Sequence, residues 1–355
     1  MPSHLFNQGE ETMMVFPSNL LRRSLLSGLV ALCLGSAAAF ADYRFIFVSH
    51  MGPHDSNSKW FELSLRTFEE KFPDVQIEYL APDKYSNEKF VELIEQAIAT
   101  NPDGIAVSII DAPAIQGAIR KAIDQGIPVM AFNTPDLRPV GQRIPYLAYV
   151  GTDPYLDGKR AAEHALAEAK AGRVPMPIKV LCINPDRAHL GLIARCRGMV
   201  DGMGEALIRT ETLVTDLDPT HASEILADYL KRNQDINYFY AVTADSAPVV
   251  WKVAKDLGLS PDADMEGATI IGVDENPISL SGVARGHLLS TMSQGFWLQG
   301  WEPAAWLYWN KKFSYKPASD IHTGPVIIDK TTVAQWEKFI RDVFGNEAYD
   351  RQIPW

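Results

Sequence analysis

Residues 103–135 contain two short apolar runs with a helix-like segment between them, and this stretch most constrains the fold. The runs cover residues 104–110 and 127–132, and apolar residues at helical spacing fill 114–124. Apolar runs of this length that alternate with helical segments are typical of βαβ units in a parallel sheet. Ligands of such sheets bind beyond the carboxyl ends of the strands. Asp111 and Asn133 directly follow the two runs and are therefore candidate ligand-binding residues.

The same alternation continues along the chain and starts again after a Gly/Pro-rich loop at 172–177. The expected strands lie at 43–49, 75–80, 104–110, 127–132, 147–150, 178–183, 210–216, 236–242, 269–273 and 288–292. The expected helices lie at 59–72, 87–99, 114–124, 154–170, 190–207, 222–232, 248–257, 277–285 and 333–344. Asp245 and Asp274 follow strands of the second half as Asp111 and Asn133 follow strands of the first. The pattern therefore predicts two similar α/β lobes.

The N-terminal residues 1–41 have the features of a secretory signal peptide. Arg22 and Arg23 precede an apolar run at 25–34, and a small-residue stretch at 37–41 predicts cleavage before Asp42. A membrane anchor is less favoured because a spanning helix needs about 20 apolar residues. We therefore expect an exported protein whose folded part is 42–355.

Length, charge and cysteine content narrow the class of protein. Residues 42–355 exceed the length that one core usually supports, about 250–300 residues, so two domains are expected. The net charge of −11 argues against nucleic-acid partners, which need basic surfaces. Cys182 and Cys196 could pair in an oxidising compartment, or remain two buried thiols.

The segment 294–312 carries four of the eight tryptophans. We interpret it as a packing helix whose aromatic side chains bury large apolar areas. Trp297 lies nearest to the preceding strand and is the one tryptophan of this segment that could face a cleft.

Seven stretches, in order, carry a resemblance to a known family. They are the polar loop before Trp60-Phe61 and the segments DGIAVSIIDAPA, GIPVMAFN, YVGTDPYLDGKRAAEHA, ARCRGMVDGM, TIIGVDENP and LLSTMSQGFWLQGW. Together they resemble periplasmic sugar-binding proteins of the ribose/galactose-binding type, the solute receptors of ABC transporters. The resemblance covers nearly all of 42–355. It implies an α/β fold of two similar lobes, each a parallel doubly wound sheet, joined by a three-stranded hinge with the ligand cleft between them.

This resemblance also implies lobe boundaries. After the signal peptide at 1–41, residues 42–150 and 295–322 would form the N-terminal lobe. Residues 151–294 and 323–355 would form the C-terminal lobe. The hinge crossovers are expected near 149–151, 294–296 and 322–325. The helix-like tail at 333–344 is expected on the C-terminal lobe.

Matching the family's motifs position by position gives a ligand site. Trp60 matches the aromatic residue that stacks on the sugar, and its loop neighbours precede it. Together with Asp111, the predicted site residues are Trp60, Asn133, Arg195, Asp274, Gln294, Asp245, Asn57, Asp55 and His54. Ala244 departs from the family, which often has Asn there, so one amide is missing and Thr243 is a partial replacement.

These residue types suit a sugar because its hydroxyls both donate and accept hydrogen bonds. Carboxylates accept from hydroxyls, a guanidinium donates in a rigid fork, and amides do both. An indole covers the apolar C–H face. Structural roles are also open: Asp111 is placed to cap the following helix, and Asp274 to start a turn before Pro277.

We therefore expect a monomeric periplasmic receptor that captures a small sugar or polyol by lobe closure and delivers it to an ABC-transporter permease. The alternative is a periplasmic sensor that presents a sugar-like signal to a chemoreceptor or sensor kinase. An enzyme is not expected, because the chain lacks a G-x-S-x-G, H-E-x-x-H or Walker A motif. No cofactor or metal site is expected, and the particular sugar is not determined by these residues.

Overall fold

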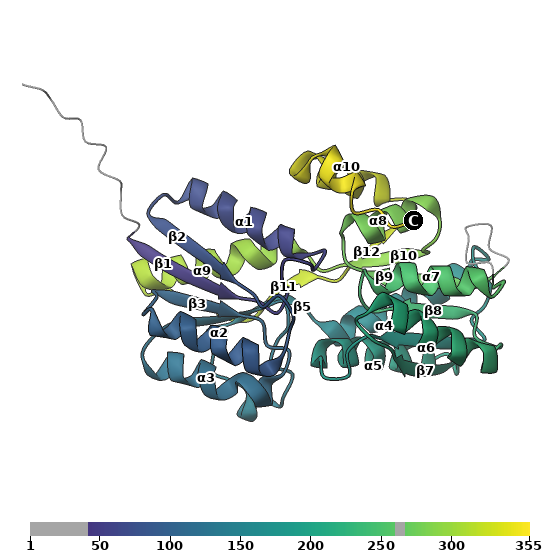
Figure 1. Ribbon diagram of the computed structural model, residues 1–355, viewed down its shortest axis with the longest axis horizontal. Coiled ribbons are helices and arrows are strands. Elements are labelled where there is room, and N and C mark those ends of the chain that lie inside the picture. Colours follow the sequence, from purple (N-terminus) through teal and green to yellow (C-terminus); the bar gives the residue numbers. More distant parts are fainter. Residues whose placement is uncertain (1–41, 260–266) are drawn as a thin grey trace, which may run out of the picture. The chain divides into compact units, whose positions relative to one another are not determined.

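The computed structural model describes residues 42–259 and 267–355, and the predicted signal peptide at 1–41 lies outside them. The described chain forms two six-stranded sheets, seen side by side in Figure 1. Sheet A has the order β11-β5-β4-β3-β1-β2 and sheet B the order β12-β10-β9-β8-β6-β7. We call sheet A with its helices lobe 1, and sheet B with its helices lobe 2.

Every strand pair is parallel except β10 with β12, which is antiparallel. The strands of sheet A are β1 (Tyr43–Val48), β2 (Val75–Leu80), β3 (Gly104–Val107), β4 (Val129–Phe132), β5 (Tyr149–Thr152) and β11 (Ile321–Gly324). The strands of sheet B are β6 (Lys179–Asn184), β7 (Arg209–Val214), β8 (Tyr238–Ala241), β9 (Thr269–Val273), β10 (Ser290–Ser293) and β12 (Val326–Asp329). The predicted α/β fold of two parallel-sheet lobes is confirmed.

Helices cover both faces of each sheet, which explains why the strands are apolar on both sides. Lobe 1 has α1 (Ser58–Lys71), α2 (Asn87–Ala99), α3 (Ala112–Asp124) and α9 (Phe296–Phe313). Lobe 2 has α4 (Pro154–Lys170), α5 (Leu190–Gly204), α6 (Pro219–Arg232), α7 (Ser246–Asp256), α8 (Pro277–Arg285), α10 (Val333–Phe344) and α11 (Asn346–Asp350). In lobe 1, α2 and α3 lie on one face of the sheet and α1 and α9 on the other (Figure 1).

Local sequence explains several helix starts. Asp153 caps α4, because its Oδ1 accepts the N–H groups of Tyr155 (2.9 Å) and Leu156 (3.1 Å), and Pro154 occupies the first turn.

The packing role of the Trp-rich segment is also confirmed, since Trp301 of α9 lies edge-on against Phe68 of α1 with ring centroids 5.0 Å apart. The strands β11 and β12 were not predicted as strands.

The chain passes between the lobes three times, which agrees with the predicted three-stranded hinge. It leaves sheet A after β5, returns between β10 and α9, and leaves again between β11 and β12. Buried Gln299 ties two of these crossings together, because its Nε2 donates to Gln294 O (2.7 Å) and to Thr323 Oγ1 (3.4 Å). The lobe boundaries at single-residue level remain a prediction.

Cys182 of β6 and Cys196 of α5 form a disulfide, so the alternative of two free thiols is wrong. Both cysteines are buried, and the bond fastens α5 to the sheet of lobe 2.

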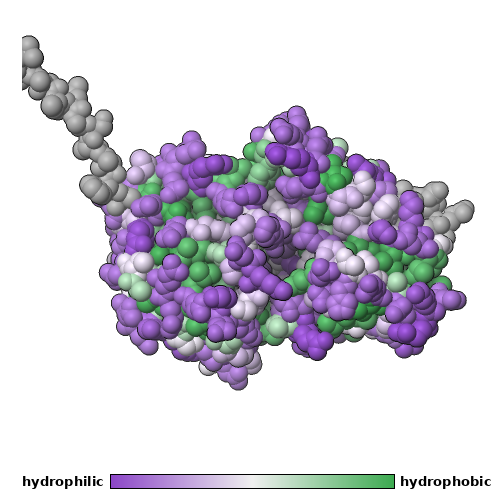
Figure 2. Space-filling view, viewed as in Figure 1, coloured by the Kyte–Doolittle hydropathy of each residue, from purple (hydrophilic) through white to green (hydrophobic). Residues whose placement is uncertain are grey.

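Most of the surface in the view of Figure 2 is hydrophilic, with small apolar patches between the hydrophilic areas. No helix of the described residues is long and apolar enough to cross a membrane.

Candidate ligand-binding site

A cavity of about 380 Å³ lies between the lobes, at the carboxyl ends of their strands. Its volume falls within the range of about 300–1,000 Å³ that small-molecule sites usually have. Eight of the predicted site residues line it, and they come from both lobes. These residues are His54, Asp55, Asn57, Asn133, Arg195, Asp245, Asp274 and Gln294.

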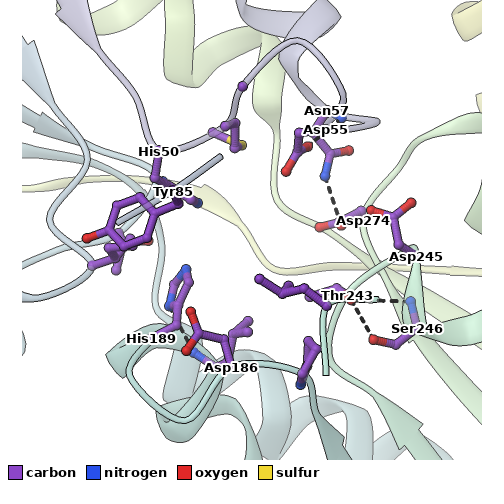
Figure 3. A pocket seen from close by; sticks show the side chains of 18 of the residues that line it. His50, Asp55, Asn57, Tyr85, Asp186, His189, Thr243, Asp245, Ser246 and Asp274 are labelled. Atoms are coloured by element: carbon purple, nitrogen blue, oxygen red, sulfur yellow. Dashed lines mark hydrogen bonds between the residues drawn. The ribbon is translucent and has the colours of Figure 1, made fainter. Parts of the chain in front are cut away.

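Hydrogen bonds join the lobes along one side of this cavity. Asn57, in the loop before α1, donates from Nδ2 to Asp274 Oδ2 of lobe 2 at 3.0 Å (Figure 3). The Oδ1 of the same Asn57 accepts from Asn276 Nδ2 at 3.0 Å. All three side chains are buried. The structure therefore describes a closed arrangement of the lobes, in which Asn57 is held by lobe 2.

Asn133 and Asp274 occupy equivalent places in the two lobes. Each directly follows a strand, β4 or β9, and each has a positive φ, 61° for Asn133 and 78° for Asp274. Residues other than glycine rarely adopt this conformation, and Asn and Asp tolerate it best. Backbone strain of this kind tends to collect at binding sites. The repeat predicted from the sequence thus places a matching polar side chain on each wall of the cavity.

Asp274 is already well supplied with protein donors. Besides Asn57, the backbone N–H of Ala244 donates to its Oδ2 at 3.2 Å, and Gln294 Nε2 donates to its Oδ1. Ala244, which has no polar side chain, therefore contributes a backbone donor. Asp274 organises this side of the cavity as well as facing it.

Arg195 is held by a buried ion pair. Its Nε donates to Asp157 Oδ2 of α4 at 2.9 Å, and its Nη1 donates to Val242 O at 2.8 Å. The side chains of Arg195 and Asp157 are 8% and 0% exposed. Among the described residues no protein group accepts a hydrogen bond from Nη2 of Arg195. Because Arg195 lines the cavity, its Nη2 can donate to a ligand there.

Two glycines allow this ion pair to form, because α4 and α5 cross in close contact. A Cβ on Gly198 would lie 2.0 Å from Tyr155 O, and one on Gly158 would lie 1.9 Å from Arg195 O. Any side chain at either position would push the helices apart. The disulfide through Cys196, next in sequence to Arg195, holds the same turn of α5 against β6.

Carboxylates crowd the wall next to Asn57 (Figure 3). Asp55 precedes α1, and Asp245 precedes α7 and reaches Ser56 Oγ at 3.5 Å across the cleft. Burial, and then repulsion from Asp245, raises the pKa of Asp55 to about 7. Hydroxyl groups of a ligand could relieve this crowding, because a carboxylate accepts hydrogen bonds from them.

Aromatic side chains form another wall. His50 of lobe 1 lies edge-on to His189 of lobe 2, with ring centroids 5.3 Å apart, and to Tyr85 at 6.4 Å (Figure 3). Burial and, less strongly, the charge of Arg195 lower the pKa of His50 to about 4. Burial also lowers the pKa of His189, whose Nδ1 accepts the N–H of Leu192 at 3.4 Å. Neutral His189 therefore carries its proton on Nε2 and can donate it.

The structure does not bring Trp60 or Asp111 to the cavity. Trp60 is 2% exposed and packs against Phe344 and Phe339 of α10, with ring centroids 4.5 Å and 6.2 Å away. The prediction that its indole faces a ligand is wrong for this arrangement, because a C-terminal helix distant in sequence covers it. Asp111 caps α3 by accepting Ala114 N–H (3.2 Å) and also accepts from Asn87 Nδ2 (2.8 Å). Its alternative structural role thus applies.

Trp297, which the sequence suggested could face a cleft, does not line the cavity. Several other residues line it that were not predicted from the sequence. The missed residues are His50, Met51, Tyr85, Asp186, His189, Thr215, Asp216, Ser246 and Phe296. Many of them sit in the loops after β1, β2, β6 and β7. The rule that ligands bind beyond strand ends applies to these loops as well. Applying that rule to every strand would have found them.

No cluster of three or more His, Cys, Asp or Glu side chains within 42–259 and 267–355 could hold a metal ion. Hydrogen-bonding and aromatic side chains line the site. Such a site can bind and orient a small polar molecule.

Comparisons with known proteins agree with this architecture. A solved carbohydrate transporter protein from Acidothermus cellulolyticus, in complex with myo-inositol, is 24% identical with a TM-score of 0.73, covering 85% of this chain and 99% of that one. A periplasmic sugar-binding protein from Legionella pneumophila is 25% identical with a TM-score of 0.69, covering 79% and 99%.

One curated relative is the xylose/arabinose-binding protein XylF of Sulfolobus acidocaldarius, 25% identical over 250 residues. The match covers 66% of this chain and 58% of XylF, so it spans less than two thirds of that protein. A family model described as a periplasmic binding protein domain matches residues 48–310, which include most of both lobes. This match extends over more than half of the chain, and the chain therefore belongs to the periplasmic binding protein family.

Proposed function

We propose that this protein is exported to the periplasm, captures a small sugar or sugar-like polyol by lobe closure and delivers it to an ABC-transporter permease. The observation that carries the proposal is the cavity between the lobes, lined from both sides by donors and acceptors. A ligand that contacts both lobes favours closure, because only a difference in affinity between two conformations shifts their equilibrium. The sugar-binding relatives support a sugar as the ligand class.

The cavity offers partners for each part of such a ligand. Arg195 Nη2 and His189 Nε2 are donors, while Asp55 and Asp245 are acceptors. His50, Tyr85 and Phe296 supply flat apolar surface in place of Trp60. Charge-assisted hydrogen bonds contribute about 1.5–3 kcal/mol each. Three or four of them, less the cost of association, are compatible with micromolar affinity, which is about −8 kcal/mol.

A thermal-shift screen of the purified protein tests the ligand class. The panel contains myo-inositol, D-arabinose, D-xylose, D-galactose and D-fucose, with amino acids as the comparison set. We expect a sugar or polyol to raise the melting temperature, because a ligand that binds the folded state stabilises it. A shift with amino acids and none with polyols would refute the sugar assignment.

A pair of variants at the two ends of α7 tests the location of the site. Asp245→Ala removes a cavity carboxylate and should abolish most of the shift caused by the best panel compound. Asp256→Ala lies at the other end of the same helix, where it pairs with Lys252 on the surface, and should keep the shift. Equal shifts in both variants would place the ligand elsewhere.

The alternative, a sensor that presents its ligand to a chemoreceptor or kinase, would use the same cavity. Stimulation of a reconstituted permease and its ATPase by the ligand-loaded protein supports delivery. Activation of a receptor kinase without such stimulation supports sensing.

A further inference from the structure

We infer that the C-terminal helix α10 positions the lobes for ligand capture: it is anchored on lobe 2, covers Trp60 of lobe 1, and so favours closure before any ligand is bound. The inference rests on the proposed function, since it concerns the closing movement. It gives Trp60 a role as the lobe 1 partner of an intramolecular clasp.

The anchor of α10 on lobe 2 is extensive. Val333 and Ile340 are buried, and α10 packs on α8 and β12. The chain end fastens the same region, because Trp355 Nε1 donates to Ile278 O (3.0 Å) and to Ser281 Oγ (2.9 Å) of α8. Figure 1 shows α10 directly beside α8. The helix therefore moves with lobe 2.

The C-terminal segment is also stiffened internally. The guanidinium of Arg341 lies 3.9 Å from the ring centroid of Tyr349 and pairs with Asp350 at 2.9 Å. The hydroxyl of Tyr349 donates to Glu337 Oε1 at 2.7 Å. These contacts join α10 and α11 into one unit that does not depend on lobe 1.

The contact with lobe 1 is made by two aromatic side chains. Phe344 lies edge-on to Trp60, and Phe339 lies nearly parallel to it with an interplanar angle of 27°. Phe339 is itself 44% exposed, whereas Trp60 is 2% exposed. Phe339 thus serves mainly as a cover for the indole rather than as part of the core of lobe 2.

A groove of about 400 Å³ lies beside this contact, between α1 and the C-terminal helices, lined by Glu62 and Leu63 on one side and by Val343 and Arg351 on the other. The aromatic rings thus make a close contact between α1 and α10 next to this groove.

Opening of the lobes would break this contact. Trp60 is three residues from Asn57, which is bound to Asp274 and Asn276 of lobe 2. Both residues sit at the same end of α1, so separating Asn57 from lobe 2 also draws Trp60 away from α10. An indole can bury about 150–250 Å² of surface, and the part of this area that α10 covers would return to water. The closed state is favoured accordingly, with no ligand involved.

A clasp of this kind raises the apparent affinity for every ligand. The apparent dissociation constant equals the intrinsic one divided by the fraction of molecules in the binding-competent state. Removing the clasp lowers that fraction and leaves the cavity walls unchanged. The effect should therefore be similar for different sugars, unlike the effect of a residue that touches one hydroxyl.

Small-angle scattering of the ligand-free protein tests the clasp directly. We expect the Phe339→Ala/Phe344→Ala variant to have a larger radius of gyration than the wild type. The control is Phe72→Ala, which removes a partly buried ring from a cluster with Phe68 and Trp301 inside lobe 1 and should leave the radius of gyration unchanged. An unchanged radius of gyration in the double variant would overturn the proposal.

Binding of the best panel polyol supplies a second test. The Phe339→Ala/Phe344→Ala variant should bind it about tenfold more weakly, equivalent to about 1.4 kcal/mol. Adding Trp60→Ala should bring little further loss, because all three changes remove one contact. An additive loss would mean that Trp60 touches the ligand, which would refute the clasp. If no polyol binds the wild type, the proposed function fails, and the scattering comparison still decides the clasp.

Discussion

Replacing Arg195 by alanine is expected to destabilise the protein strongly, in addition to weakening ligand binding. The guanidinium neutralises Asp157, whose side chain is 0% exposed, and it also satisfies Val242 O. Removing one partner of a buried ion pair costs about 3–5 kcal/mol, because the other charge stays buried without compensation. At roughly 2–4 °C per kcal/mol, the melting temperature should fall by on the order of 10 °C.

A second variant separates stability from binding. Arg195→Met combined with Asp157→Leu removes both charges and fills the space with apolar side chains, which is often close to neutral. The double variant should therefore recover most of the lost melting temperature. It should still bind the best panel polyol poorly, because no guanidinium faces the cavity.

Thermal unfolding and calorimetric titration, measured on the same preparations, check both expectations. If Arg195→Ala has the same melting temperature as the wild type, the ion pair does not stabilise the fold as described. If the double variant binds as tightly as the wild type, Arg195 has no contact with the ligand.

Three further predictions follow from other parts of the structure. Gly198→Ala should lower both the melting temperature and the affinity for the ligand, because its Cβ would force α4 away from α5. The control Gly204→Ala lies on the same helix, where nothing lies within 4 Å of a Cβ, and should change neither. Equal melting temperatures of the two variants would refute the close contact between the helices. Asp55 has a folded-state pKa of about 7, above its ordinary 3.8, so the stability it confers at low pH is lost as the pH rises toward 7. Asp55→Asn should therefore raise the melting temperature at pH 8 more than at pH 5, and the surface variant Asp228→Asn should show no such trend. The double variant Cys182→Ala/Cys196→Ala should lower the free energy of unfolding in urea by about 3 kcal/mol, because the disulfide closes a loop with a sequence separation of 14. An unchanged urea midpoint would argue against the disulfide.

Helix starts and strand positions could be read from local sequence because their causes are local. Asp153 before Pro154 caps α4, and the apolar run before Asp274 forms β9 as predicted. The residues just beyond strand ends, such as Asn133 and Asp274, were found because a parallel sheet brings these ends together. Asp111 obeys the same rule but turns back to cap its own helix. Local sequence offered both roles, and only packing chose between them.

Trp60 shows what the sequence left open. Its place in the first turn of α1 follows from the chain order, yet what covers its indole depends on Phe339 and Phe344, which lie more than 270 residues later. The opposite walls of the cavity raise the same difficulty, since His50 and His189 meet only when two separate sheets close on each other.

The sequence by itself determined the two parallel sheets and most of the polar side chains at their edges, because hydrophobic periodicity and capping act over a few residues. The tertiary structure decided which of those side chains face the cavity, which form ion pairs behind it, and which part of the tail lies across the lobes. Those choices depend on close packing between distant segments, and packing is a property of the folded surfaces rather than of any short stretch of chain.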